Sequence, residues 1–327
     1  MFEYLITVTP LGLMYGSAGA FLSPENLVGR SGAKFPPDAA TLSGLFFSAN
    51  YTNENRDRLK HDLIVSGPFW AKQDAPDNFY VPIPRHRIIG KDARDEWRIK
   101  NHHWERREND ETKPEIKSDY HWQTIDSWNK PLKTVDVAEN PWKYVSFLHP
   151  KLKAEERCVE DENGLFLENA VQLEDDCCLV YLATETLPDG WYRLGGEGHM
   201  VEISSQEIKP KDSIHELLNQ KIDRTFALIT PGVWGSKALS YRYPRHSDFP
   251  REGMKLLTDK AVPYRYRANQ KLGRGRYAVP AGSVYVLKKP LDRTWWEFPE
   301  EWFPKEGFSL KHLGCGLCLP VKIQGVE

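Results

Sequence analysis

Apolar and polar residues largely alternate at the start of the chain, from Phe2 to Thr9, with the two-residue period of a β-strand. After a loop of small residues, Phe35–Ala49 place apolar side chains at helical spacing, and Asp38 stands where a helix cap is expected. Residues 63–71 and 78–84 then predict a hairpin that turns at 74–78. Strand, helix and hairpin in this order are the first half of a ferredoxin-like, or RNA-recognition-motif-like, domain.

The pattern changes at residues 85–130, where charges of both signs surround four tryptophans. We interpret this stretch as an insertion with some helix, whose tryptophans pack on the domain or on a neighbouring protein. Beyond it, a capping box at Ser213–Glu216 predicts a helix that extends to about Arg224. Further strands are predicted at 176–184, 191–204, 225–230, 282–288 and 316–323.

The length of 327 residues is enough for two ordinary cores. We therefore predict an α+β fold with long loops and two ferredoxin-like domains, at 1–165 and 166–327, the first carrying the insertion at about 85–130. The N-terminal segment lacks the basic start and long apolar core of a signal peptide, and no apolar run is long enough to cross a bilayer. We accordingly expect a cytoplasmic protein that does not associate with membranes.

Five cysteines give little sign of metal or redox chemistry. Cys315 and Cys318 have the Cys-x-x-Cys spacing of zinc and redox sites, but the adjacent Cys177 and Cys178 would make a poor second pair of ligands. The motif also falls within a predicted apolar strand. Buried structural thiols explain it better, so we expect no metal and no cofactor.

Positive charge is concentrated near the C-terminus, although the formal net charge of the chain is −2. Residues 237–276 hold eleven lysines and arginines against three acids, with tyrosines interspersed. Such a mixture suits single-stranded nucleic acid, because phosphates take the charge and bases stack on rings. A solvated, arginine-rich loop is the alternative. A second basic turn follows a predicted strand at Arg85 and Arg87, and it too suits either phosphate contact or solvent.

A glycine-rich patch separates two predicted strands at 193–199, where Gly195, Gly196 and Gly198 precede His199. It lacks the Gly-Lys-Ser/Thr of a Walker loop, and no helix follows it as in a dinucleotide fingerprint. It is either a tight hairpin or a backbone surface that lies against RNA. His199 is a candidate general base for RNA cleavage, although a histidine beside glycines is more often structural or in contact with a ligand.

Five segments, in order, resemble one family, the third subunit of the Cmr (type III-B) CRISPR effector complex, of the RAMP superfamily. A close type III-D relative shares these features, and the motifs do not separate the two. The segments are Phe35-Pro-Pro-Asp-Ala-Ala-Thr-Leu-Ser-Gly44, Phe79-Tyr-Val-Pro-Ile-Pro84, Leu194-Gly-Gly-Glu-Gly198, Ala278-Val-Pro-Ala-Gly-Ser-Val-Tyr-Val286 and Leu313-Gly-Cys-Gly-Leu317.

The resemblance implies a non-catalytic subunit that caps the 5′ handle of the CRISPR RNA. It also implies docking to the large polymerase-like subunit and contact with adjacent backbone RAMP subunits. The glycine-rich segments of the family correspond to Gly195, Gly196 and Gly198, and to Gly314 and Gly316. The opening loop differs from the family pattern, which usually has an Arg-Asp-Gly-Arg-Pro-Phe-like stretch, so RNA contact there would depend on backbone amides or on nearby basic residues. The predicted RNA contacts are Gly16, Ser17, Gly19, Arg30, Lys34, Arg85, Arg87, Gly195, Gly196, Gly198, His199, Arg265, Arg267, Lys271, Arg274 and Arg276.

Two alternatives have different consequences. One is a metal-independent endoribonuclease of the same superfamily that processes CRISPR precursor RNA through His199. The other is a protein-only scaffold, whose basic stretch binds an acidic protein partner.

Overall fold

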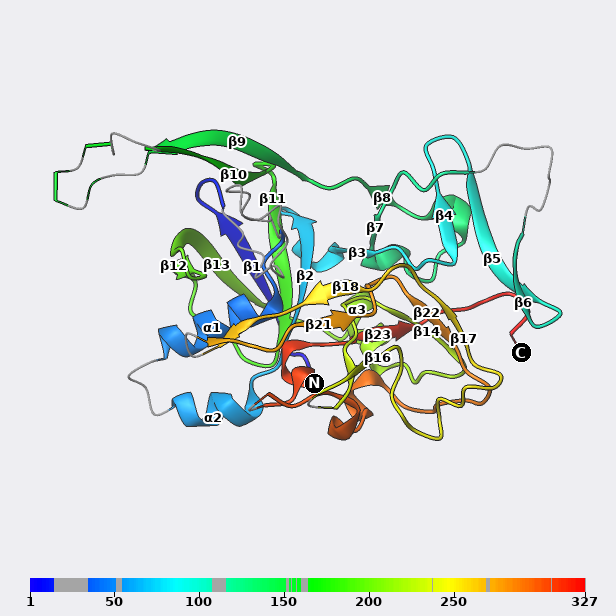
Figure 1. Ribbon diagram of the computed structural model, residues 1–327. Coiled ribbons are helices and arrows are strands. Elements are labelled where there is room, and N and C mark those ends of the chain that lie inside the picture. Colours follow the sequence, from blue (N-terminus) through cyan, green and yellow to red (C-terminus); the bar gives the residue numbers. More distant parts are fainter. Residues whose placement is uncertain are drawn as a thin grey trace.

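The computed structural model describes residues 1–14, 35–50, 55–107, 116–150, 153, 155–156, 158–159, 164–236, 238–268, 271–306 and 308–326. Its largest sheet is built from β1 (Tyr4–Pro10), β2 (Val65–Lys72), β3 (Tyr80–Pro82), β7 (Trp122–Thr124), β8 (Val137–Ala138), β11 (Cys177–Ala183), β12 (Gly190–Leu194) and β13 (His199–Glu207). The strand order is β12-β13-β1-β11-β2-β3-β7-β8 (Figure 1).

The centre of this sheet confirms the opening pattern of the sequence. Two helices, α1 (Ala39–Ala49) and α2 (Asn55–Asp62), lie between β1 and β2 in the chain. Strand β11 lies between β1 and β2 in the sheet and is antiparallel to both, which is a split β-α-β arrangement. Asp38 directly precedes α1 as predicted, but its side chain makes no capping hydrogen bond.

A second sheet is formed by β14 (Thr225–Leu228), β17 (Lys255–Leu257), β22 (Val284–Val286) and β23 (Cys318–Pro320), in the order β17-β22-β14-β23. Its four strands have the same connectivity as four strands of the first sheet. In chain order these are β14, β17, β22 and β23 in the second sheet, and β1, β2, β11 and β13 in the first. In both sheets the fourth strand lies beside the first, and the third lies between the first and the second. No α-helix connects the strands of this sheet among the residues the structure describes. The helix predicted at 213–224 is shorter than expected, because α3 (Ser213–Asn219) ends well before Arg224 and is preceded by Asp212 as its N-cap residue.

The predicted boundary at residue 165 does not separate the two sheets. Strands β11, β12 and β13 follow that residue, yet they belong to the sheet of β1. The chain passes from one sheet to the other between Glu207 and Thr225. The sheets share one core, in which Phe69 and Val180 belong to the same buried cluster as Phe226 and Tyr285. A second core on the other face of the first sheet buries the apolar side of α1.

The insertion is mostly strand rather than helix. It forms a small sheet from β4 (Arg87–Ile89), β5 (Arg94–Lys100) and β6 (His103–Arg106), and its described part contains one short 3-10 turn at Ile125–Ser127. The expected packing of its tryptophans on the domain is confirmed for Trp128, which is buried and donates an indole hydrogen bond of 2.7 Å to the carbonyl oxygen of Pro320.

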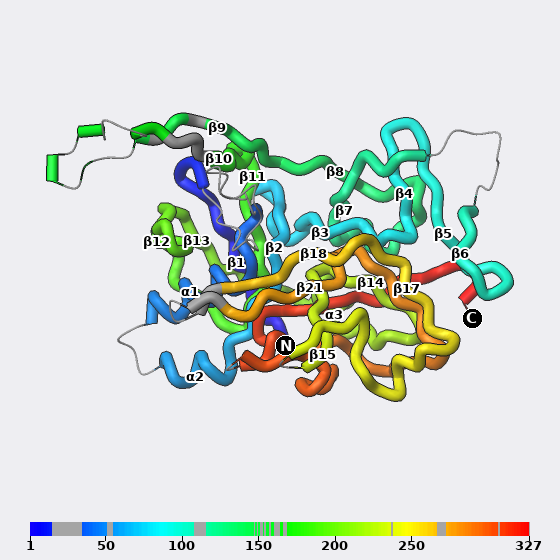
Figure 2. The backbone as a smooth tube through the Cα atoms, viewed as in Figure 1, coloured from blue at the N-terminus to red at the C-terminus, as the bar shows by residue number. Residues whose placement is uncertain are grey.

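A long hairpin of β9 (Trp142–Pro150) and β10 (Leu165–Leu173) projects from the body of the molecule (Figures 1 and 2). The sequence reasoning did not predict it. Among the described residues, no helix has the length and apolar character that a membrane crossing requires. The remaining strands are β15 (Trp234–Gly235), β16 (Ser240–Tyr241), β18 (Val262–Tyr264), β19 (Arg267–Ala268), β20 (Lys271–Leu272) and β21 (Arg276–Ala278), and the other 3-10 helices span Pro76–Asn78, Leu132–Thr134, Trp295–Glu297, Glu300–Trp302 and Leu310–Leu313.

Candidate nucleic-acid interface

The glycine-rich patch is a tight turn between β12 and β13. Gly195 and Gly198 adopt φ values of +74° and +67°, which side-chain-bearing residues rarely adopt, and the Gly198 N–H donates to the Gly195 carbonyl oxygen at 3.3 Å. The hairpin interpretation is therefore confirmed. Gly196, between them, is exposed, and a β-carbon at this position would meet no described atom within 4 Å. The turn thus presents bare backbone on its outer side.

This turn lies over the start of α1. A β-carbon at Gly195 would stand 3.6 Å from Cγ2 of Thr41, in the first turn of that helix. Arg193 is exposed on β12, beside the turn, and His199 is half-buried at the start of β13. The first and third resemblance segments, far apart in the sequence, are therefore neighbours.

The basic segment reaches the same end of the molecule. Strands β18 and β21 pair with Tyr264 opposite Arg276, and β19 pairs with β20 further along, so that these four strands form an arm directed toward α1 (Figure 2). Tyr264 is buried at the base of the arm. Burial raises its pKa well above the usual value, and nearby acidic groups that include Asp38 add to this effect. The arm, the helix start and the glycine-rich turn together form what we call the α1-end surface.

The arginines of this arm differ in exposure. Arg274 is exposed, and its side chain forms no ion pair with a described residue. Arg265 is half-buried and donates from Nε to the Gly273 carbonyl oxygen at 2.7 Å. Arg267 and Lys271 lie on β19 and β20, near the tip.

Arg276 has an internal partner that the sequence did not reveal. Its side chain is 2% exposed, and Nε lies 2.7 Å from Oε1 of Glu306. Nη1 donates to the Ser236 carbonyl oxygen at 3.1 Å. The structure therefore corrects the prediction for Arg276, because its guanidinium braces the arm from inside and has little surface left for a phosphate.

The second basic turn lies elsewhere, beside the insertion. Arg87 is half-buried and donates to Oε1 of Gln123 at 3.1 Å and to the Lys130 carbonyl oxygen at 3.0 Å. This burial lowers the pKa of the guanidinium, and the contacts assign it to packing of the insertion rather than to RNA. Arg85 is half-exposed and forms an ion pair of 3.2 Å with Asp259. The predicted contacts Gly16, Ser17, Gly19, Arg30 and Lys34 lie outside the described residues.

The remaining glycine motifs allow distant segments to pack closely. Gly314 has φ +60°, and a β-carbon there would lie 2.2 Å from the Ser66 hydroxyl oxygen. At Gly316 a β-carbon would lie 2.5 Å from the Trp234 ring, and at Gly282 it would lie 2.7 Å from the Ile83 carbonyl oxygen. These glycines let distant segments approach closely, which assigns Gly314 and Gly316 a structural role.

The cysteines of the Cys-x-x-Cys motif are buried, as expected for structural thiols. Burial raises the pKa of Cys315 to about 12, and its sulfur accepts the Val233 N–H at 3.0 Å. The pKa of Cys318 is also raised by burial. Both thiols therefore stay protonated at neutral pH.

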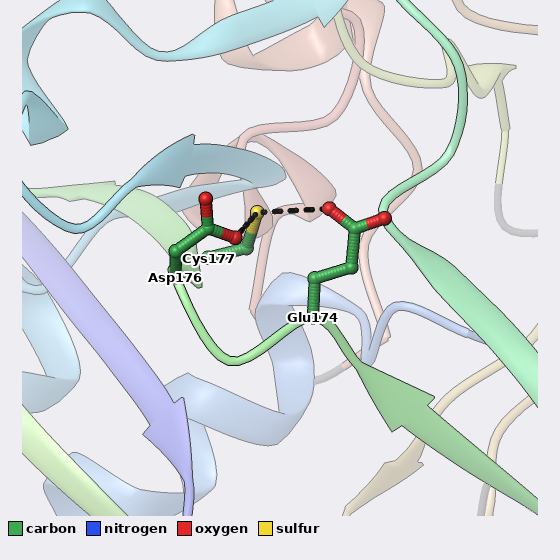
Figure 3. A group of neighbouring side chains, drawn as sticks. All are labelled: Glu174, Asp176 and Cys177. Carbon is green, nitrogen blue, oxygen red and sulfur yellow. Dashed lines mark hydrogen bonds between the residues drawn. The ribbon is translucent and has the colours of Figure 1, made fainter.

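One group of potential metal ligands gathers at Glu174, Asp176 and Cys177 (Figure 3). The Lys72 ammonium lies 2.8 Å from Oδ2 of Asp176 and 3.5 Å from Oε2 of Glu174. Burial raises the pKa of the Cys177 thiol to about 11. A lysine thus occupies the position where this group would attract a cation.

Comparison with known proteins identifies the family. The model of a CRISPR-associated protein family, Cas_Cmr3, matches residues 12–322. The chain belongs to this family. The resemblance predicted from the motifs is thereby confirmed, and the chain is a RAMP-type subunit of a type III CRISPR effector complex. No curated protein matches it.

Two solved structures contain chains that are similar to this one. One titled as the type III-B Cmr-beta complex bound to cognate target RNA contains a similar chain, with a TM-score of 0.50 and 11% identity over 87% of this chain and 86% of that one. A Csm3–Csm4 subcomplex of a type III-A CRISPR-Cas interference complex gives a TM-score of 0.42 and 11% identity over 88% of this chain and 98% of that one. At 11% identity, the similarity to the Cmr-beta chain concerns the fold alone.

Proposed function

We propose that this chain is a non-catalytic subunit that binds and caps the 5′ handle of the CRISPR RNA. The observation that carries the proposal is the convergence of three sequence segments at the α1-end surface. Bare backbone at Gly196 and the exposed Arg193 lie beside the start of α1, and the arm that carries the exposed Arg274 extends toward this helix (Figure 2). Amides and arginines suit the phosphates of a short RNA that is held without being cut.

The repeated strand connectivity supports a two-domain plan for this subunit. Both sheets have the strand order of a ferredoxin-like domain, the second without its helices. We therefore propose two ferredoxin-like domains that share a core, divided near residues 208–224 rather than at 165.

The projecting hairpin supports contact with other subunits. Tyr144, Leu148 and Leu165 of this β9–β10 hairpin are exposed by 52%, 62% and 59%. Large apolar side chains that protrude in this way suit a protein neighbour. We propose that such surfaces dock the large polymerase-like subunit and adjacent backbone subunits.

The RNA proposal is tested by measuring binding of repeat-derived handle RNA to the purified chain by fluorescence anisotropy at several salt concentrations. Arg274→Ala should weaken binding by about three- to tenfold and lower the salt dependence by about one released ion. Lys211→Ala, which changes an exposed lysine near α3, is the matched control. Handle binding that is unchanged in Arg274→Ala would favour a scaffold that binds only protein.

The ribonuclease alternative needs a separate assay. Incubation of the chain with repeat RNA in the presence of a metal chelator should leave the RNA intact. Metal-independent cleavage that is lost in His199→Ala would replace our proposal with the endoribonuclease.

A further inference from the structure

A groove of about 520 Å³ lies far from the α1-end surface, where the second sheet meets the inserted β5–β6 hairpin and the C-terminal segment (Figure 1). Three elements that are distant in the sequence form its walls. Its principal lining residues are Ile99, His102, Arg224, Lys255, Val286 and Val326.

The walls of the groove are fixed by backbone contacts. The Ile99 N–H donates to the Gln324 carbonyl oxygen at 2.9 Å. Gly325 has φ +85°, and a β-carbon there would stand 1.9 Å from the Ile99 carbonyl oxygen, so glycine is required for this approach. Asn101 and His102 have φ values of 51° and 63°, as in the tight two-residue turn of a hairpin. The turn carries His102 into the lining.

Positive charge in the groove has no ion-pair partner among the residues that the structure describes. Arg224 directly precedes β14 and Lys255 begins β17, so the two flank β22. Lys288 lies over Gly253, whose missing β-carbon would be 3.1 Å from its Cδ. Neither these three cations nor His102 form an ion pair with a described carboxylate, and the described lining contains no acidic residue. Arg224 uses only Nε internally, in a hydrogen bond of 3.3 Å to the Leu287 carbonyl oxygen.

We propose that this groove binds the phosphate of a nucleotide, either a free nucleotide or one within an RNA strand. An arginine fork and lysine ammonium groups recognise phosphate. The side chains of Ile99, Val286 and Val326 offer an apolar wall for the sugar or base. The volume is within the usual range of small-molecule sites. The site is separate from the α1-end surface, so it does not depend on handle binding there.

Isothermal titration of the full chain with uridine 5′-monophosphate, uridine and a short 5′-hydroxyl oligouridylate tests the proposal. For a free nucleotide, the monophosphate should bind at least about tenfold more tightly than uridine, and Lys255→Ala should weaken it by about tenfold. If the groove instead binds a nucleotide within an RNA strand, Lys255→Ala should weaken binding of the oligouridylate by about tenfold, while the monophosphate binds weakly. Lys211→Ala should change neither ligand, and Lys255→Arg should restore binding.

Two results would overturn the proposal. One is that no ligand loses affinity in Lys255→Ala while that variant keeps the circular dichroism of the wild type. The other is that uridine binds as tightly as both its monophosphate and the oligouridylate. Handle binding that depends on Arg274 would persist in either case, so failure here is distinct from failure of the proposed function.

Discussion

The Arg276–Glu306 ion pair allows two roles of Arg276 to be distinguished by experiment. The sequence predicted that Arg276 contacts RNA, whereas the structure gives its side chain an internal partner. Its Nε and the Glu306 carboxylate are 2.7 Å apart, and the two side chains are 2% and 13% exposed. At this distance the attraction is about 6 kcal/mol for an effective dielectric of about 20, and the cost of desolvation offsets most of it. Removing one partner leaves the other charge buried, which typically costs about 3–5 kcal/mol.

We expect Arg276→Ala to lower the free energy of unfolding by about 3 kcal/mol, near the lower limit, because Glu306 keeps the Arg274 N–H as a donor at 3.3 Å. Urea denaturation followed by tryptophan fluorescence measures this change. Arg274→Ala, two residues away and exposed, should change stability by less than about 0.5 kcal/mol.

A double-mutant cycle isolates the pair itself. Arg276→Met combined with Glu306→Leu should cost clearly less than the sum of the two single changes, since no unpaired charge is left. If Arg276→Ala costs less than about 1 kcal/mol and instead abolishes RNA binding, the internal role is refuted.

Three further predictions follow from buried positions. Gly314→Ala should destabilise the protein by at least about 2 kcal/mol, because φ is +60° and a β-carbon would lie 2.2 Å from a serine hydroxyl oxygen; a variant with wild-type melting temperature would contradict this contact. Burial, and secondarily the charge of Arg87, lowers the pKa of His86 to about 3. Below pH 6.5 this histidine is therefore protonated in the unfolded chain but stays neutral in the folded chain. Stability should be complete above that pH and fall by about 2 kcal/mol from pH 7 to pH 5, and His86→Gln should remove this part of the slope in urea titrations at both pH values. Iodoacetamide should modify the exposed Cys158 in the native protein well before Cys315, as mass spectrometry of timed samples would show; equal rates would mean that Cys315 is accessible.

Local patterns predicted the first sheet well, because strand alternation at 2–9 and helical spacing at 35–49 arise from residues close in sequence. The domain boundary was harder to predict. Strand β11 pairs with β1 across more than 160 residues of chain, and no local signal marks that pairing. The insertion was misjudged for a similar reason, since its mixed charges conceal a small sheet whose paired residues are largely polar.

The candidate site was predicted in part. The glycine-rich turn was recognised from composition, and its position over Thr41 required the fold. A count of positive charges could not distinguish the exposed Arg274 from the buried Arg276, because Glu306, the ion-pair partner of Arg276, is thirty residues away in the sequence. The β9–β10 hairpin was not predicted, although the aromatic and β-branched run at 142–148 could have indicated a strand there.

The most direct test of the account is to map where handle RNA contacts the chain. Handle RNA with 4-thiouridine near its 5′ end can be photocrosslinked to the full-length protein, and the modified peptides identified by mass spectrometry. We predict crosslinks within 38–41, 193–199 and 262–276, reduced by Gly196→Leu, whose side chain would project from bare backbone, and unchanged by Gly44→Leu, which lies outside these segments on the exposed side of α1. Crosslinks confined to other parts of the chain, and insensitive to Gly196→Leu, would contradict the proposal that the α1-end surface holds the CRISPR RNA handle.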